Sequence, residues 1–549
     1  MRRHTPDVAL GLVVLLGAYA GWRLFWFLTD DAFIAFRYAS NSVLGHGLVW
    51  NPPPFRAVEG YTSFLWVRLL EVVWRVTGIE PPRSANWISL AFGYATLWLG
   101  ACWLARLSLP AAQAAHRRLF ATLVLLGTLT NRTFLTWLSS GLETAMFNFF
   151  VTWWMFAALA PRREGAWLLR FSLATALLGL SRPDGLLFGV AWAVIAGLHL
   201  RESHGAPGPT WRRGAQAAPM LAVALHVAWR RWTYGEWLPN TYTAKHVEPW
   251  AESGLRYLAS FVFEYGVWVW LLLLGAWLAR ALRRPPRREA LGRHLVPAVA
   301  ITTLALQVGY YTFAVGGDHF EYRVYSHLVL LLFVSAVWLA ARSFDRPWQA
   351  AAAVAAFVIV SWPIPWTHWL ETRALTTRAQ TLRMARPIAP RFPAPLRPAV
   401  AAWDDWQAWL ARRRVCVRHQ EHKVFWIYQI HRLPTRSEGS AIGWEQRAVT
   451  VRGSVGVPGW VLPEVAVIDE FGLNDRVIAR NPRPRYGIRR MAHDRIPPAG
   501  YVECFRPNLE IGDGVLRLED RDRPLTDDEI RACESRDWSG RELTGADRS

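Results

Sequence analysis

The chain has 549 residues, of which 52% are hydrophobic, and its mean hydropathy is +0.11. Long apolar blocks fill the chain up to about Trp366, which excludes an ordinary soluble domain of this length. The formal net charge is +20, but the arginines stand between the apolar blocks, where positive charge marks cytoplasmic loops. This placement argues against nucleic acid as a partner.

The first apolar run, from Val8 to Leu28, is long enough to span a bilayer. Ala18-Tyr19-Ala20 has the small-residue pattern of a signal-peptidase site, but the apolar character continues well beyond it. We therefore expect an uncleaved first transmembrane helix.

Similar apolar runs predict about eleven membrane-spanning helices in residues 1–366. They cover 8–28, 85–105, 119–138, 144–160, 166–181, 185–200, 216–232, 257–279, 295–315, 325–341 and 349–366. The loop at 29–84 also holds an apolar segment, Tyr61 to Val76, in which charged residues three and four positions apart share one helical face. That spacing favours a helix lying on the membrane surface.

The positive-inside rule places the N-terminus in the cytoplasm, because the largest basic cluster, Arg280 to Arg293, then falls inside. Arg230 and Arg231 fall at an outer end and count against this orientation. An odd number of spans leaves residues 367–549 outside the cytoplasm, as expected for an inner-membrane protein with an extracytoplasmic tail.

The tail is predicted to begin with a linker, 367–398, followed by a small α+β domain, 399–549. We expect a helix at Val400 to Arg413 and strands at Val415 to Arg418, Val424 to Ile430, Val449 to Val457 and Val465 to Ile468. In an oxidising compartment Cys504 and Cys533 are the favoured disulfide pair, with Cys416 left over, and three unpaired thiols are the alternative.

Polar clusters collect at the outer ends of the predicted spans, where ionisable residues are costly unless they are paired or functional. Asp30 and Asp31 follow the first span, and two adjacent carboxylates near a membrane raise the pKa of one another. One is a candidate general base for a hydroxyl proton. Alternatively, the pair holds a divalent cation (Mg, Mn or Ca), or both simply follow a helix end.

A second set of candidates consists of cations that suit an anionic ligand, because guanidinium groups bind phosphate oxygens in a fork. They are Arg37, Arg182, Lys245 and Arg323. The structural alternative is pairing, of Arg182 with Asp184 and of Arg323 with Asp318 or Glu321. His319, in a glycine-containing turn, is a candidate proton relay. The remaining candidates in these clusters are Glu59, Tyr61, Glu143, Asp184, Asn240 and Asp318.

These motifs resemble one bacterial family of membrane glycosyltransferases. The similar segments begin with Asp30-Asp31-Ala32-Phe33-Ile34 and Val58-Glu59-Gly60-Tyr61-Thr62. Those that follow, in the family's order, are Ser140-Gly141-Leu142-Glu143-Thr144, Ser181-Arg182-Pro183-Asp184-Gly185, Leu238-Pro239-Asn240-Thr241, Gly316-Gly317-Asp318 and Gly472-Leu473-Asn474-Asp475. The family includes the terminal β-(1→2)-arabinofuranosyltransferase of the actinobacterial cell wall.

The resemblance implies a C-type glycosyltransferase fold and a polyprenyl-phosphate sugar donor. It implies transfer of arabinofuranose, or of a similar pentose or hexose, to a cell-envelope glycan on the periplasmic side. Asp30 or Asp31 would be the catalytic carboxylate, and Arg182, Lys245 and Arg323 would face the donor phosphate. The segment from Asn51 to Arg56 departs from the family's shorter turn.

Two other functions compete with this one. A transporter or flippase of a lipid-linked sugar would use the same cations without a base, although paired broken helices and internal symmetry are absent from the sequence. A membrane-anchored glycan-binding assembly protein would carry its function in the tail alone, which leaves the polar clusters of the membrane half without a purpose.

Overall fold

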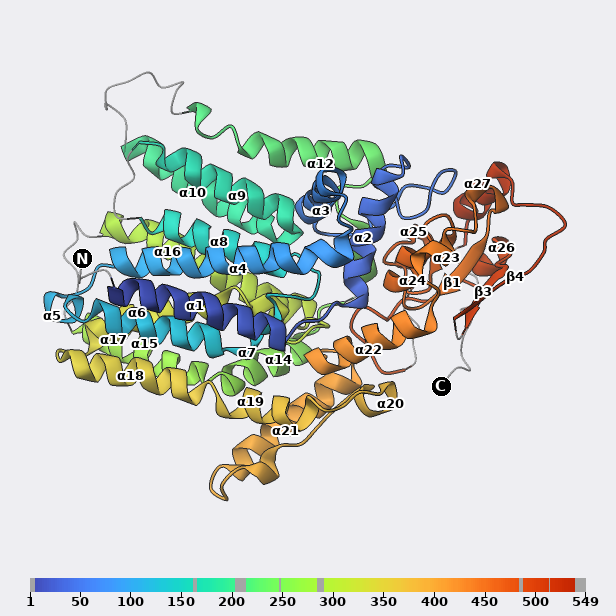
Figure 1. Ribbon diagram of the computed structural model, residues 1–549. Helices are drawn as coiled ribbons and strands as arrows, with labels where there is room; N and C mark the ends of the chain where they lie inside the picture. The colour runs from blue at the N-terminus through green and yellow to red at the C-terminus, as the bar shows by residue number, and fades with distance from the viewer. Residues whose placement is uncertain are drawn as a thin grey trace.

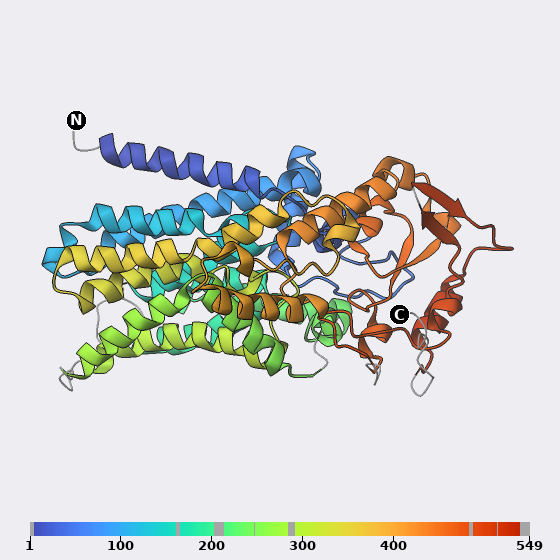
Figure 2. The ribbon, with the colours of Figure 1, turned by 90° about the horizontal axis from the view of Figure 1, so that it is seen from below.

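The apolar segments form helices that lie side by side in one bundle, and the tail covers one end of it (Figures 1 and 2). The computed structural model describes residues 5–160, 165–202, 214–245, 248–283, 291–482, 487–512 and 514–538. The N-terminal end of the first helix and the tail lie at opposite ends of the bundle (Figure 1). Residues 284–290 of the predicted basic cluster from Arg280 to Arg293 fall outside the described residues.

Helices occupy every segment predicted to span the membrane. They are α1 (Thr5–Leu24), α4 (Pro81–Arg106), α6 (Arg117–Thr130), α8 (Thr144–Ala158), α9 (Trp167–Ser181), α10 (Leu186–Glu202), α12 (Met220–Tyr234), α14 (Ala251–Glu264), α15 (Val267–Leu282), α16 (Leu291–Gly309), α17 (Leu328–Ser343), α18 (Pro347–Val360) and α19 (Pro363–Thr372). Among the described residues, five helical stretches are long and apolar enough to cross a bilayer, and a bent pair makes a sixth. The chain is therefore a polytopic helical membrane protein, as predicted.

The bent pair corrects one predicted span. Residues 257–279 were expected to form one helix, but α14 and α15 meet at an angle of 85°. Gly266, between them, has a left-handed backbone with φ of +61°. A β-carbon there would lie 2.7 Å from the Val360 side chain, so only glycine permits this close approach.

The first outer loop forms α2 (Asp30–Val43) and α3 (Phe64–Thr77) across the end of the bundle that the tail covers. Figure 1 shows α3 nearly along its axis, whereas the bundle helices lie across the view. Glu71 accepts from Arg68 at 2.6 Å and from Arg75 at 3.0 Å, so the charged face predicted from their spacing is present.

The tail is mainly helical, with two small sheets. Strands β1 (Val449–Arg452) and β2 (Ala466–Asp469) pair in parallel, and β3 (Leu509–Gly512) and β4 (Val515–Leu518) form an antiparallel pair. The principal helices are α21 (Arg397–Arg412), α22 (His419–Arg432), α24 (Gly456–Val461), α25 (Arg476–Arg480) and α27 (Asp527–Ser535). The shorter ones are α20 (Arg378–Thr381), α23 (Arg436–Gly439) and α26 (Tyr501–Cys504).

Three strand predictions need correction. Val424 to Ile430 lies inside α22, because a short apolar run reads alike for strand and buried helix, and five preceding polar residues extend it to helical length. The strand from Val449 stops at Arg452, before α24 begins at Gly456. Of Val415 to Arg418, only Val417 pairs, in an isolated bridge with Phe320.

Buried polar contacts join the tail to the bundle. Arg418 of the tail forms an ion pair with Glu264 of α14 at 2.8 Å, and both side chains are buried. The Trp50 indole of the outer loop donates to the carbonyl oxygen of Val467 in β2 at 2.8 Å. Within the tail, Cys504 and Cys533 form a disulfide, and Cys416 is free and buried. The tail thus packs as part of the same unit as the outer loop.

Candidate active site

A cavity of about 150 Å³ lies where the outer loop, the ends of several bundle helices and the tail meet. Asp30 and Asp31 enter it from the start of α2, and Lys245 enters from α13 (Asn240–Lys245). His319 comes from the turn after α16, and the tail supplies the opposite wall. Residues far apart in the sequence therefore meet in one polar pocket at the end of an apolar bundle.

Asp30 is the buried member of the acidic pair, with 9% of its surface exposed. Its carboxylate accepts hydrogen bonds from the main-chain N–H of Val457 at 2.8 Å and of Gly456 at 3.2 Å, both in α24. Burial raises the pKa of Asp30 to about 7, and the neighbouring charge of Asp31 raises it further, while the two amides oppose the shift. Asp30 thus connects α2 to the tail.

Asp31 is half-buried on the pocket wall and has no hydrogen bond or ion pair with any residue that the structure describes. Burial lowers the pKa of Lys245, and among the neighbouring charges Asp31 opposes that fall most strongly. A carboxylate that is open to the pocket and free of internal partners is placed to accept a proton from a bound hydroxyl.

Three cations on the pocket wall have no ion pair among the described residues. They are Lys245, Arg383 and Arg414. A fourth, Arg378, forms an ion pair with Glu421 at 3.2 Å and lies over the Phe425 ring. The pocket therefore offers three cationic side chains without ion-pair partners, beside the carboxylates of its wall, and such side chains suit a phosphate group.

His319 is held in one tautomer. Its Nδ1 lies 2.7 Å from the carbonyl oxygen of Arg414, and because a carbonyl only accepts, Nδ1 carries the proton. Burial lowers the pKa of His319, so its Nε2 is an unprotonated acceptor at neutral pH. The rings of His422 and His493 lie 5.2 and 5.5 Å from it, centroid to centroid, and burial lowers the pKa of both.

Arg37 was predicted to bind the donor, and the structure gives it another role. The side chain is fully buried. Its nitrogens donate to the carbonyl oxygens of Trp50, Gly459, Leu462 and Val465 and to Asn51 Oδ1, at 2.6–3.2 Å. All of its N–H groups are therefore used to fasten α2 to the tail, and none is left for a ligand.

The other outer-loop candidates are also engaged in the structure. Glu59 is buried and accepts two hydrogen bonds from Arg230, at 2.5 and 3.2 Å, so the arginine that counted against the predicted orientation is neutralised internally. The hydroxyl of Tyr61 lies 3.2 Å from that of Tyr234. Asn240 donates to the carbonyl oxygens of the turn that follows β2, at 2.8–3.2 Å.

The remaining cationic candidates form ion pairs beside the pocket rather than on its wall. Arg182 binds Glu143 at 2.8 Å and Asp184 at 3.0 Å, and Arg323 binds Asp318 at 2.8 Å. The pairings of Arg182 with Asp184 and of Arg323 with Asp318 are the ones weighed as alternatives from the sequence. Of the four predicted cations, only Lys245 lines the cavity.

Several pocket residues were missed from the sequence. Arg378 and Arg383 lie in the segment interpreted as a linker, and Arg414 and Asp469 belong to the tail. One local signal is visible only in the structure: Arg383 and Arg414 have left-handed backbones, with φ of +53° and +56°. Non-glycine residues held in this region cost energy and concentrate at functional sites.

The fit of a divalent cation to Asp30 and Asp31 can be judged from their surroundings. No group of three or more His, Cys, Asp or Glu placed to hold a metal ion occurs in the part of the chain that the structure describes. Both oxygens of Asp30 already accept main-chain hydrogen bonds. The residues present therefore do not fit a dedicated cation site.

No family model matches the chain, and no curated protein matches it in sequence. Among solved structures, the chain is similar to ArnT from Cupriavidus metallidurans bound to undecaprenyl phosphate, with 13% sequence identity and a TM-score of 0.49. The match covers 85% of this chain and 86% of that one.

Proposed function

We propose that this chain is a membrane glycosyltransferase that moves a sugar from a polyprenyl-phosphate donor to a cell-envelope glycan. The observation that carries the proposal is the pocket itself. It joins a free carboxylate, Asp31, to three cations without ion partners, at the end of an apolar bundle. A lipid-linked sugar phosphate needs these features together: an apolar region for its chain, cations for its phosphate and a base for the acceptor.

The proposed reaction is a single displacement at the anomeric carbon. The acceptor hydroxyl oxygen forms the new glycosidic bond as the bond from the anomeric carbon to the phosphate oxygen breaks, through an oxocarbenium-like transition state. Asp31 takes the hydroxyl proton. Lys245, Arg383 and Arg414 stabilise the charge that develops on the departing polyprenyl phosphate. One displacement inverts the configuration of that carbon.

We infer that the sugar is arabinofuranose or a similar pentose or hexose, and that transfer takes place on the periplasmic side. Both inferences rest on the sequence motifs and on the positive-inside rule. A flippase would need the same cations but no base, so the position of Asp31 on the pocket wall favours transfer over transport.

The central test uses membranes containing the full-length protein and a labelled polyprenyl-phosphate sugar. Asp31→Asn should reduce covalent transfer at least about 100-fold, because it removes a general base. Asp345→Asn, an exposed aspartate that pairs with Arg280 far from the pocket, is the matched control and should retain transfer. Full transfer in both Asp31→Asn and Asp30→Asn would reject the assignment of these carboxylates. Movement of the labelled lipid without any covalent product would favour the flippase.

Chelation tests the metal question separately. Because the pocket residues do not fit a cation site, we expect transfer to continue in EDTA. Loss of transfer that Mg²⁺, Mn²⁺ or Ca²⁺ restores would instead assign the two aspartates to metal binding, the alternative drawn from the sequence.

A further inference from the structure

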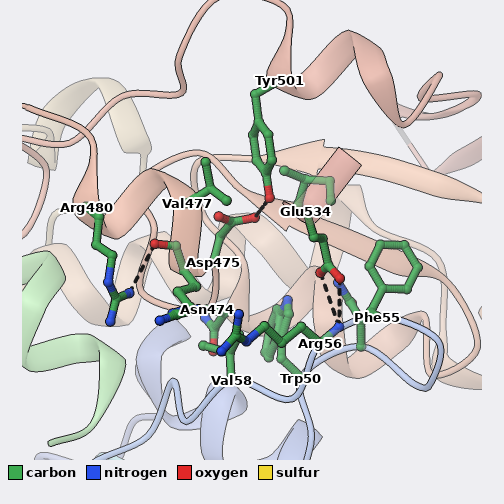
Figure 3. Close-up of a pocket in the computed structure, with 13 residues that line it drawn as sticks. Trp50, Phe55, Arg56, Val58, Asn474, Asp475, Val477, Arg480, Tyr501 and Glu534 are labelled. Carbon is green, nitrogen blue, oxygen red and sulfur yellow. Dashed lines mark hydrogen bonds between the residues drawn. The ribbon is translucent and has the colours of Figure 1, made fainter. Parts of the chain in front are cut away.

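A second cavity, of about 250 Å³, is lined by residues of the outer loop, of the turn that follows β2 and of the tail helices (Figure 3). Residues at the end of β2 and in this turn line both cavities. Asp469, Phe471 and Leu473 face the pocket of the two aspartates. Ile468, Asn474 and Asp475 face the second cavity. The segment 468–475 therefore contributes to the walls of both cavities.

Three arginines line the second cavity. Arg476 and Arg480 share one carboxylate, that of Glu236, at 2.8 and 3.0 Å. Arg56 is exposed, and its guanidinium has no ion pair or hydrogen bond with any described residue. In Figure 3 the Arg56 side chain extends along the cavity beside Asn474. Two carboxylates, those of Asp475 and Glu534, also line it, so charge alone does not decide what it binds.

The two acids that line the cavity are occupied by the protein. Asp475 caps α25, accepting from the Ile478 N–H at 2.9 Å, and accepts from the Tyr501 hydroxyl at 2.7 Å. Glu534 accepts from the main-chain N–H of Arg56 at 2.9 and 3.2 Å, and burial raises its pKa to about 7. The Arg476 Nε is buried without a hydrogen-bond acceptor. The groups of this cavity that lack a hydrogen-bond partner are therefore N–H donors that carry positive charge.

We propose that the second cavity binds an anionic sugar unit, a uronate or a sugar phosphate, within the glycan acceptor. Guanidinium groups bind carboxylate and phosphate oxygens in the same forked geometry. Taking the ligand as part of the acceptor rests on the proposed transferase function, whereas binding of the anion does not.

The position of Arg56 supports this assignment. It ends the segment from Asn51 to Arg56 of the outer loop. Its side chain thus brings the outer loop, which carries the two aspartates, to the cavity that the tail forms. An acceptor held here would bind next to the segment 468–475, which also lines the pocket of the proposed base.

Equilibrium binding to the full-length protein in nanodiscs tests the proposal. The probes are labelled glucuronate, labelled glucose 6-phosphate and neutral glucose. Either anion should bind more tightly than glucose, and the tighter of the two identifies the source of the charge. Arg56→Gln and Arg480→Gln should each weaken anion binding about tenfold, the loss of one charge-assisted hydrogen bond. Arg531→Gln, an exposed arginine on α27, is the matched control and should bind normally.

Lys245→Gln separates the two cavities, because it changes only the wall of the first. It should leave anion binding intact while it reduces sugar transfer. Equal loss of anion binding in Lys245→Gln and Arg56→Gln would overturn the proposal by placing the anion in the first cavity. Failure of both anions to bind better than glucose would also overturn it. Neither result would change the outcome of the transfer test on Asp31, so the two proposals fail independently.

Discussion

Asp30 and Asp31 are adjacent and have the same side chain, but their burial and hydrogen-bond partners differ. Asp30 is buried with its pKa near 7, and Asp31 faces the pocket. Between about pH 4 and 7 the folded protein keeps on Asp30 a proton that the unfolded chain releases, so this group lowers stability as the pH rises through that window. We expect the thermal midpoint of the wild type to fall with pH relative to that of Asp30→Asn. Parallel curves would contradict the buried site, and Asp405→Asn, an exposed aspartate of α21, should run parallel to the wild type.

Arg37 shows how a residue type alone can mislead. Its guanidinium group could bind a phosphate, but in this fold it donates hydrogen bonds to main-chain carbonyl oxygens of the outer loop and the tail. We expect Arg37→Lys to lower the free energy of unfolding by about 3 kcal/mol, because it keeps the charge but leaves buried carbonyls without donors. Thermal unfolding in detergent measures the loss. If Arg37→Lys has normal stability and a raised KM for the donor, Arg37 binds the donor after all.

At the scale of elements, the contact between α2 and α24 positions the acidic pair. A β-carbon on Gly456 would lie 1.8 Å from the carbonyl oxygen of Asp30, so Gly456→Ala forces the two helices apart. We expect a loss of transfer of about 100-fold, since small displacements of reacting groups are costly. Gly275→Ala, in α15, is the matched control because its β-carbon would meet no atom within 4 Å. Undiminished transfer in Gly456→Ala would show that α24 does not position the site.

The sequence predicts elements well where one physical signal dominates. Apolar length located the bundle helices, and helical charge spacing located α3. It failed where tertiary contacts decide, as in α22, whose apolar run fits either a strand or a buried helix. It also failed for the cations of the pocket: Arg383 and Arg414 have no local pattern that distinguishes them from other arginines, and only the packing of the tail brings them to Asp31.

At the scale of the whole molecule, the function depends on which side of the membrane the tail faces. The N-terminal end and the tail lie at opposite ends of the bundle, so a cytoplasmic N-terminus places the pocket outside (Figure 1). The Cys504–Cys533 disulfide supports this orientation, because disulfides persist in oxidising compartments. A donor carried by a polyprenyl lipid suits a site that soluble nucleotide sugars do not reach.

Labelling of single cysteines with a membrane-impermeant maleimide decides the orientation. Cys102→Ser provides the background, since Cys416 is buried and the other two cysteines are bonded. The reporters are Asp528→Cys in the tail and Asp345→Cys at the opposite end, whose native side chains are 96% and 81% exposed. In cells with a permeable outer layer and an intact inner membrane, Asp528→Cys should be labelled and Asp345→Cys protected until lysis. The reverse pattern would place Asp31 and its cations in the cytosol, where a pocket supplied by an outward-facing lipid-linked sugar could not operate.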